Sequence, residues 1–249
     1  MSLSYRKINA VLQLKLRLML SNMSVLFPPI FSIVFVIAMG NLMPEVDAGE
    51  AGAPFSTSGF LLSFGLIFNI AIAGISMSSS PIAEEKEKHT LRVLMTSSVK
   101  GAEYFIGSMI PILFILVLTN LLLLPASGVS FEDIPVPTYL AITTLCSLIS
   151  ILIGYIIGVY SKNQAQASLI STPILLMLTS TPVLKAFDEN LARFLDYSYG
   201  GVLSNLSDSL AAGGGYEWNL TDASVLFVWL AAALTIFIYI YKKNGLDNG

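Results

Sequence analysis

Six long stretches without a charged residue constrain this chain more than any other feature of its sequence. They cover residues 18–44, 51–83, 104–131, 134–161, 163–184 and 223–241. Each is long enough for the roughly 17–25 residues with which an α-helix crosses a bilayer. Only 12% of the residues are charged and 55% are hydrophobic, against about 25% and 45–50% in ordinary soluble domains. The sequence therefore predicts a membrane protein whose apolar surface is largely solvated by lipid.

We expect an all-α integral membrane protein with a single transmembrane domain over residues 1–249. The apolar cores within the uncharged stretches predict six transmembrane helices, at about 25–43, 58–79, 106–127, 138–160, 166–184 and 223–241.

Residues 1–22 precede the first span and mix basic with apolar side chains. A polar stripe at helical spacing runs along this segment, formed by Arg6, Asn9, Gln13 and Arg17. This pattern favours a cytoplasmic amphipathic helix that lies in the membrane interface, with the Lys15 ammonium extended toward water. The alternative is an ordinary basic flank that only sets the orientation of the chain.

Positive charges are divided unequally between the two predicted sides of the membrane. Short cytoplasmic loops retain Lys and Arg. With the N-terminus inside, eleven of the 13 basic residues face the cytoplasm, namely Arg6, Lys7, Lys15, Arg17, Lys86, Lys88, Arg92, Lys100, Lys162, Lys242 and Lys243. Only Lys185 and Arg193 lie outside. We therefore expect a multi-pass protein of the cell (plasma) membrane with both termini in the cytoplasm.

The longest predicted extracellular segment, residues 185–221, lies between the last two spans. Four apolar residues share one helical face there, namely Val202, Leu203, Leu206 and Leu210. This pattern predicts a partly helical cap over the outer mouth of the bundle. A loop that only returns the chain to the last span is the alternative.

The sequence lacks the residues that several kinds of catalysis and binding require. One His, one Cys and no H-E-x-x-H pattern argue against metallohydrolase and Cys–His mechanisms. No glycine-rich loop is followed by the Lys-Ser/Thr pair that binds phosphates. A net charge of −3 lacks the basic surface of a nucleic-acid-binding protein. We expect no catalytic residue, no metal site and no cofactor in this chain, and no nucleic-acid partner.

The predicted cytoplasmic loop at 81–104 is the most informative segment. Ser80 can cap a helix whose first residue is Pro81, and Glu84 with Lys88 forms an i,i+4 pair. These features predict a short helix over 81–96. This helix would carry an apolar ridge suited to docking a soluble partner, formed by Leu91, Leu94 and Met95. A solvated charged turn that only anchors the topology is the alternative.

This loop resembles that of the ABC-2 type permeases, the membrane subunits of ABC transporters. The family pattern runs approximately E-R-E-x-G-T-L-E-x-L-L-x-T-P-V-S, and residues 85–96 follow its acidic, Thr-Leu and apolar positions, with Val99 and Gly107 in step. His89 stands where the family usually has Gly, Ser97-Ser98 replaces its Pro, and Ser108 replaces a Lys. The detailed motif covers residues 84–108, and the six-span layout extends the resemblance loosely over the whole chain.

The resemblance implies partners as well as a fold. A separate ABC ATPase subunit, which binds ATP and Mg, drives such permeases, and two permease chains pair in the lipid bilayer, here expected as a homodimer. It also implies an ATPase-coupling interface on the loop, made of Glu84, Glu85, Glu87, Lys88, His89, Thr90, Leu91, Arg92 and Leu94.

We therefore expect a coupling helix in the permease subunit of an ABC exporter, which is not itself an enzyme. The apolar spans suit a hydrophobic or amphipathic substrate such as a peptide, toxin or drug. Export of a polysaccharide or lipid-linked glycan is the alternative within the family. An intramembrane enzyme and a peptide-immunity protein that transports nothing are alternatives from other classes.

Overall fold

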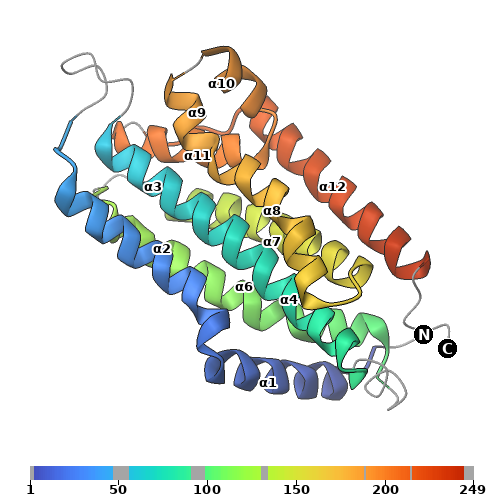
Figure 1. Ribbon diagram of the computed structural model, residues 1–249. Helices are drawn as coiled ribbons and strands as arrows, with labels where there is room; N and C mark the ends of the chain where they lie inside the picture. The colour runs from blue at the N-terminus through green and yellow to red at the C-terminus, as the bar shows by residue number, and fades with distance from the viewer. Residues whose placement is uncertain are drawn as a thin grey trace.

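The computed structural model describes residues 3–46, 56–90, 99–129, 134–187, 189–213 and 215–243. Within these ranges the chain forms helices and no strand. Six helical stretches are long and apolar enough to cross a membrane, and they lie side by side as a bundle (Figure 1). They are α2 (Met23–Leu42), α3 to α4 (Thr57–Glu87), α6 (Gly101–Ala126), α7 (Val136–Tyr160), α8 with the start of α9 (Gln164–Lys185) and α12 (Leu220–Lys243). The predicted all-α fold with six transmembrane helices is confirmed.

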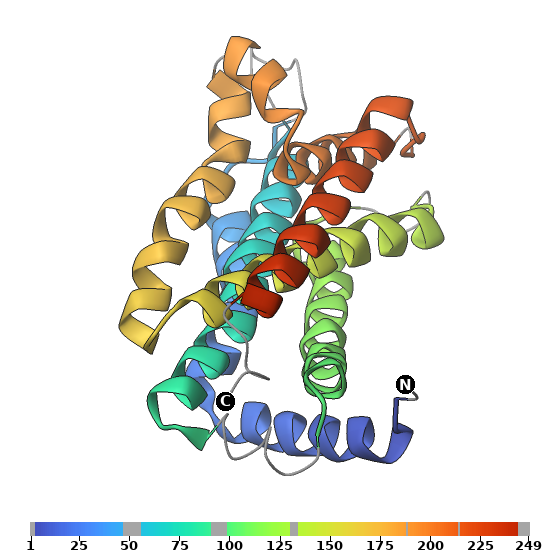
Figure 2. The ribbon, with the colours of Figure 1, turned by 90° about the vertical axis from the view of Figure 1, so that its right-hand side faces the viewer.

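The two ends of the bundle carry different helices. Helix α1 (Tyr5–Ser21) lies across one end, and three short helices gather at the other (Figure 2). These three are α9 (Thr181–Phe187), α10 (Glu189–Leu195) and α11 (Tyr199–Ala211). We call the two ends the α1 end and the α11 end. The segment predicted as an N-terminal helix is thus helical, whereas its place at a membrane surface and the side on which each terminus lies stay predictions.

The second span is one continuous rod rather than a span followed by a separate helix. It consists of α3 (Thr57–Ile67), the π-helix η2 (Phe68–Ala73) and α4 (Gly74–Glu87). Ser80 and Pro81 lie inside α4, so the predicted start of a new helix at Ser80 is wrong. The Ser80 hydroxyl accepts a hydrogen bond from Gln164 Nε2 at 2.5 Å instead of capping a helix.

Close packing against α7 explains why α4 continues through its proline. A Cβ atom on Gly154 would lie 1.8 Å from Ser78 Oγ, and one on Gly158 would lie 2.8 Å from the Ser79 carbonyl oxygen. The two helices therefore meet almost backbone to backbone, as small residues permit in membranes. A proline in a helix removes one backbone hydrogen bond and strains the preceding turn. The contact with α7 holds that turn of α4 in place despite this loss.

A polar pair lies in the middle of the bundle. Asn69, in η2, donates through Nδ2 to Asn120 Oδ1 of α6 at 2.9 Å, and both side chains are fully buried. Each asparagine thus takes part in an interhelical hydrogen bond. Tyr139 of α7 adds to the pair, because its hydroxyl donates to the Asn120 carbonyl oxygen at 2.6 Å.

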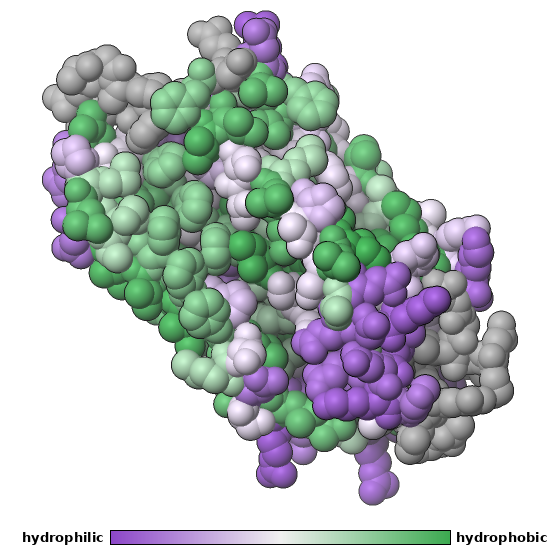
Figure 3. Space-filling model, in the orientation of Figure 1, coloured by the Kyte–Doolittle hydropathy of each residue, from purple (hydrophilic) through white to green (hydrophobic). Residues whose placement is uncertain are grey.

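A column of phenylalanine rings covers one face of the bundle between α2 and the α3–η2 rod. Neighbouring ring centroids lie 4.9–6.3 Å apart. The rings belong to Phe27, Phe31 and Phe35 of α2 and to Phe60, Phe64 and Phe68 of the rod. A spacing of four residues places each set on one helix face. The rings are only partly buried, and the surface over α2 and α3 is mostly apolar (Figure 3).

At the α11 end, α11 is part of the core rather than a loose connection. Val202, Leu203 and Leu206 are fully buried and Leu210 is 5% exposed. These are the four residues whose spacing predicts a single apolar face. The extracellular position of this segment stays a prediction.

Candidate functional site

The predicted coupling residues lie at the end of α4. Glu84, Glu85 and Glu87 occupy its last turn, and Lys88, His89 and Thr90 follow directly. Leu91, Arg92 and Leu94 lie outside the described residues. A hydrophilic surface spreads over this part of α4 and the neighbouring start of α8 (Figure 3).

Glu85 belongs to a buried triad that joins three helices. Its Oε1 accepts a hydrogen bond from Lys15 Nζ of α1 at 2.5 Å, and its Oε2 accepts one from the Tyr104 hydroxyl of α6 at 2.5 Å. Lys15 Nζ also donates to the Tyr104 oxygen at 3.0 Å and lies 4.8 Å from the ring centroid. Lys15 is 3% exposed and Tyr104 is fully buried. The expectation that Lys15 extends toward water is therefore wrong, because a carboxylate and a phenol satisfy its charge inside the protein.

Two further contacts hold the end of α4 against α7 and α8. Lys86 Nζ donates to the Val159 carbonyl oxygen near the end of α7 at 2.6 Å. The backbone N–H of Gln164, the first residue of α8, donates to Glu87 Oε2 at 3.2 Å. Lys15, Lys86, Tyr104 and Gln164 are site residues that sequence reasoning missed. The only local signal for Lys15 is its spacing of four from Val11 and Met19, which are also buried.

The remaining charged residues of this segment face the solvent. Lys88 Nζ lies 2.6 Å from Glu84 Oε1, and the two side chains are 65% and 39% exposed. This confirms the predicted i,i+4 pair. The hydrogen bond that Lys88 donates to Glu84, together with the negative charge of that carboxylate, raises the pKa of Lys88 above its ordinary value.

His89 ends α4 in a conformation that suits glycine. Its φ is 57°, in the left-handed region, and its N–H donates to the Lys86 carbonyl oxygen at 3.1 Å. Helices often end with such a residue, which is usually glycine because a Cβ atom is strained there. The family pattern has glycine at this position, and the structure gives the physical reason.

Glycine at position 107 allows α1 to approach α6. A Cβ atom there would lie 2.8 Å from the Ile8 carbonyl oxygen and 2.8 Å from Val11 Cβ. One turn earlier, Glu103 Oε1 accepts from the Ser4 N–H at 2.8 Å and Oε2 accepts from the Lys100 N–H at 3.0 Å. Glu103 thereby fixes the starts of both helices, and α1 is docked along its length.

These contacts join the end of α4 to the rest of the bundle. Within the described ranges, no group of three or more His, Cys, Asp or Glu residues could hold a metal ion. What the residues do is fasten the exposed end of α4 to α1, α6, α7 and α8. A force on this end would therefore be passed to most of the bundle.

Comparisons with known proteins place the chain in a family. A family description of the ABC-2 type transporter matches residues 6–182, which cover more than half of the chain and include the whole α4 end. Comparison with individual curated proteins gives no match. Permeases of this family are non-catalytic transport subunits and, as a family, work with an ABC ATPase. With its six apolar helices, this multi-pass membrane protein belongs to the ABC-2 type transporter family.

Proposed function

We propose that this chain is the permease subunit of an ATP-driven exporter and that the end of α4 is its contact with the ATPase. The observation that carries the proposal is the Glu85 triad, which joins the last turn of α4 to α1 and α6. Beside it, Glu84, Glu87 and Lys88 are available to a soluble partner. One short segment thus combines an exposed charged surface with a rigid attachment to the bundle.

The rod from α3 to α4 gives this contact a path into the membrane. It runs without interruption from Thr57 to Glu87. Movement of its exposed end would be shared with α1 through Lys15 and with α7 through Lys86. In this proposal the partner subunit binds ATP and Mg, and a second copy of the permease completes the translocation path.

The phenylalanine column supports an apolar cargo. Benzene rings offer large hydrophobic surface and no conventional hydrogen-bond donor or acceptor. A sugar chain needs polar partners for its many hydroxyl groups, whereas a hydrophobic or amphipathic peptide, toxin or drug does not. The partly buried rings of α2 and the rod therefore favour a hydrophobic or amphipathic substrate.

The experiment is co-expression with a candidate ABC ATPase subunit. The Leu91→Asp and Leu94→Asp double substitution would bury unpaired charge in the proposed contact, at a cost of several kcal/mol. We expect it to abolish both co-purification of the ATPase and ATP-dependent efflux of a labelled hydrophobic peptide. Glu87→Lys should weaken both by less than about tenfold, because an exposed ion pair contributes only about 0–1 kcal/mol.

Detergent gel filtration of each variant controls for folding. Retained assembly and efflux in the double Asp variant would contradict the proposed coupling. Wild-type chain that shifts its melting temperature with ATP in the absence of the ATPase would contradict the assignment of ATP to a partner.

Orientation is tested separately with two exposed positions in a Cys146→Ser background. Ala212→Cys follows α11, and Lys162→Cys lies between α7 and α8. An impermeant thiol reagent added to intact cells should label position 212 and leave position 162 unlabelled until the cells are opened. The reverse pattern would place the α1 end outside and contradict the export direction.

A further inference from the structure

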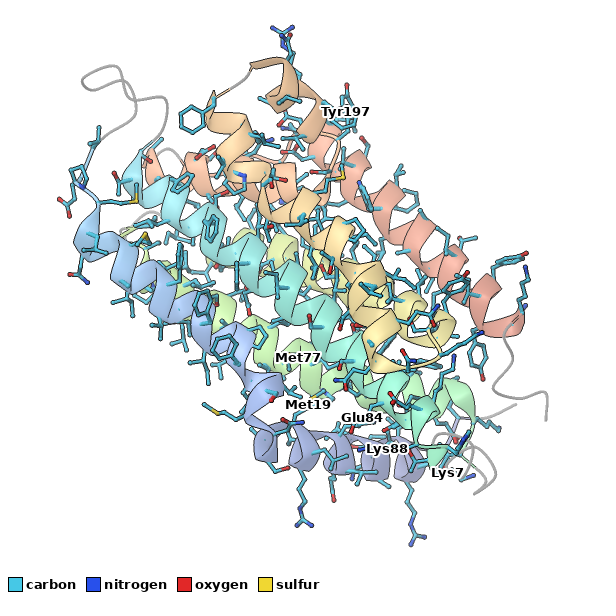
Figure 4. The ribbon with its side chains drawn as sticks, in the orientation of Figure 1. Lys7, Met19, Met77, Glu84, Lys88 and Tyr197 are labelled. Atoms are coloured by element: carbon cyan, nitrogen blue, oxygen red, sulfur yellow. The ribbon has the colours of Figure 1, made fainter. Side chains whose placement is uncertain are left out.

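A cavity of about 940 Å³ lies at the α1 end, between α1, the start of α2 and α4. This volume falls within the roughly 300–1,000 Å³ of small-molecule sites. Met19 and Met77, from α1 and α4, line one part of it, and Glu84 and Lys88 lie farther along α4 (Figure 4). The cavity therefore has an apolar part and a charged rim, which is the distribution that an amphiphile requires.

The two ion pairs around the cavity differ in their availability. Lys15 and Glu85 form part of the wall, but their charges are committed to each other and to Tyr104 inside the protein. Glu84 and Lys88 pair on the exposed surface of one helix. Exposed i,i+4 pairs are weak. This second pair can therefore open for a ligand without disturbing the fold.

The charges at the rim select among headgroups. Opening the pair exposes one carboxylate and one ammonium, so a neutral ligand that carries one charge of each sign leaves both satisfied. An anionic headgroup would satisfy Lys88 and leave Glu84 without a partner. Among zwitterions, a primary ammonium donates hydrogen bonds to a carboxylate, whereas a quaternary ammonium cannot.

We propose that this cavity binds a zwitterionic phospholipid with a primary ammonium group, taken from the leaflet on the α1 side. The phosphate accepts from Lys88, the ammonium donates to Glu84, and the upper part of the acyl chains lies against Leu14 and Met23, which line the cavity and are 44% and 66% exposed. Methionine side chains adapt to chains of different shape. This site requires that the α1 end lie at a membrane surface. It shares Glu84 and Lys88 with the proposed ATPase contact, so it is tested on the chain without the ATPase.

The test uses the purified chain alone in vesicles of phosphatidylcholine. A bimane label on Leu18→Cys, in a Cys146→Ser background, reports from the cavity wall, where Leu18 is 50% exposed. Ser24→Cys, also at the cavity, provides a second reporter. Val34→Cys on α2 is the matched control, because Val34 is 56% exposed and does not line the cavity. Brominated phosphatidylethanolamine, phosphatidylcholine or phosphatidylglycerol is added at equal low mole fraction as the quencher.

At the cavity reporters we expect phosphatidylethanolamine to associate about fivefold more strongly than either other lipid, which corresponds to about 1 kcal/mol. At Val34 the three lipids should quench equally. Glu84→Gln and Lys88→Gln should each bring the ratio at the cavity close to one without changing the gel-filtration profile.

Three outcomes would overturn the proposal. They are equal quenching by the three lipids at both kinds of position, a preference for phosphatidylglycerol, and a preference for phosphatidylethanolamine that survives Glu84→Gln and Lys88→Gln. Because no ATPase is present, a failure here leaves the proposed coupling untouched. Loss of ATPase binding in the double Asp variant likewise says nothing about the lipid.

Discussion

Each end of the bundle has an ion pair that joins separate segments of the chain, yet the two pairs have different surroundings. At the α1 end, Lys15 and Glu85 lie 2.5 Å apart, and their side chains are 4% and 16% exposed. At the α11 end, Lys185 and Asp196 lie 2.6 Å apart, and their side chains are 13% and 38% exposed. Almost equal distances thus describe one pair enclosed by protein and one that water reaches.

The difference shows that the surroundings, and not the distance, decide what such a pair contributes. A buried ion whose partner is removed keeps its charge in a medium that solvates it poorly. A partly exposed ion whose partner is removed is taken over by water. The α1 end should therefore depend on its pair, whereas the α11 end should tolerate the loss. The following predictions test this contrast, beginning with the largest effect.

We expect Lys15→Met to lower the free energy of unfolding by about 3–5 kcal/mol, because the Glu85 carboxylate, only 16% exposed, is left without its cation. Lys185→Met, the matched change at the α11 end, should cost only about 0–1 kcal/mol. Thermal unfolding in detergent measures both. Adding Glu85→Gln to Lys15→Met should recover part of the loss, since it removes the unpaired charge. Equal costs for the two lysine variants would contradict the comparison.

Two glycine substitutions compare the packing at the two ends. Gly107→Ala forces α1 away from α6 and should cost about 1–3 kcal/mol, the usual range for overpacking. At Gly40, near the end of α2, a Cβ atom would lie 3.5 Å from Leu61 Cδ1, which is an ordinary contact. Gly40→Ala should therefore stabilise the chain by up to about 1 kcal/mol through helix propensity. We expect increased protease cleavage of α1 in Gly107→Ala but not in Gly40→Ala, because only the first loosens the contact between α1 and α6. Cleavage of Gly107→Ala equal to that of the wild type would contradict this prediction.

Backbone conformation supplies a third pair of variants. His89→Gly relieves the left-handed strain after α4 and should stabilise the chain by about 0.5–1 kcal/mol. Gly128, which follows α6 at the α11 end, has φ 81°, so Gly128→Ala should cost about 1 kcal/mol. Urea unfolding in mild detergent measures the change in the free energy of unfolding for both variants. A destabilised His89→Gly variant would show that the imidazole makes a contact worth more than the strain.

The smallest expected effect concerns pH. Desolvation raises the pKa of Asp208 in α11 above its ordinary value, and the positive charge of Lys185 opposes this. The folded state then holds the proton more tightly than the unfolded state, so stability falls as the pH rises from the ordinary value through the raised one. Asp208→Asn should remove this fall and stabilise the chain at pH 7 by less than about 1 kcal/mol, because water screens the charge. Melting curves at pH 4 and pH 7 check it, and an unchanged pH dependence in the variant would refute it.

The spans could be predicted because hydropathy alone determines them. The first was expected at 25–43 and is Met23–Leu42. Charge-free runs show where lipid can surround a helix, and that requirement is local in the sequence. The face of α11 could be predicted for a similar reason, since its four apolar residues recur at helical spacing.

The triad and the course of α4 could not be predicted, because they depend on distant residues. Lys15 binds Glu85, which is 70 positions away in the sequence, and Tyr104, which is 89 positions away. No local sequence pattern indicates these contacts. Ser80 and Pro81 have the types that begin helices, but contacts with α7 and α8 override that preference. His89 is an intermediate case. The sequence shows a departure from the family glycine, and only the backbone conformation shows what the departure costs.

The π-helix in the second span affects the rotational register of the whole rod. A π-turn closes with one residue more than an α-turn, and each residue of an α-helix advances the chain by about 100°. The segment Phe68–Ala73 therefore absorbs a rotational offset between the two halves of the rod. Deleting one residue there would let an α-turn close in its place and would keep Glu85 facing Lys15 and Ser78 against Gly154. Deleting one residue of α4 before Ser78 would instead turn both side chains away by about 100°. The register of this rod, counted in single residues, thus determines whether its two ends can be packed correctly in the same molecule.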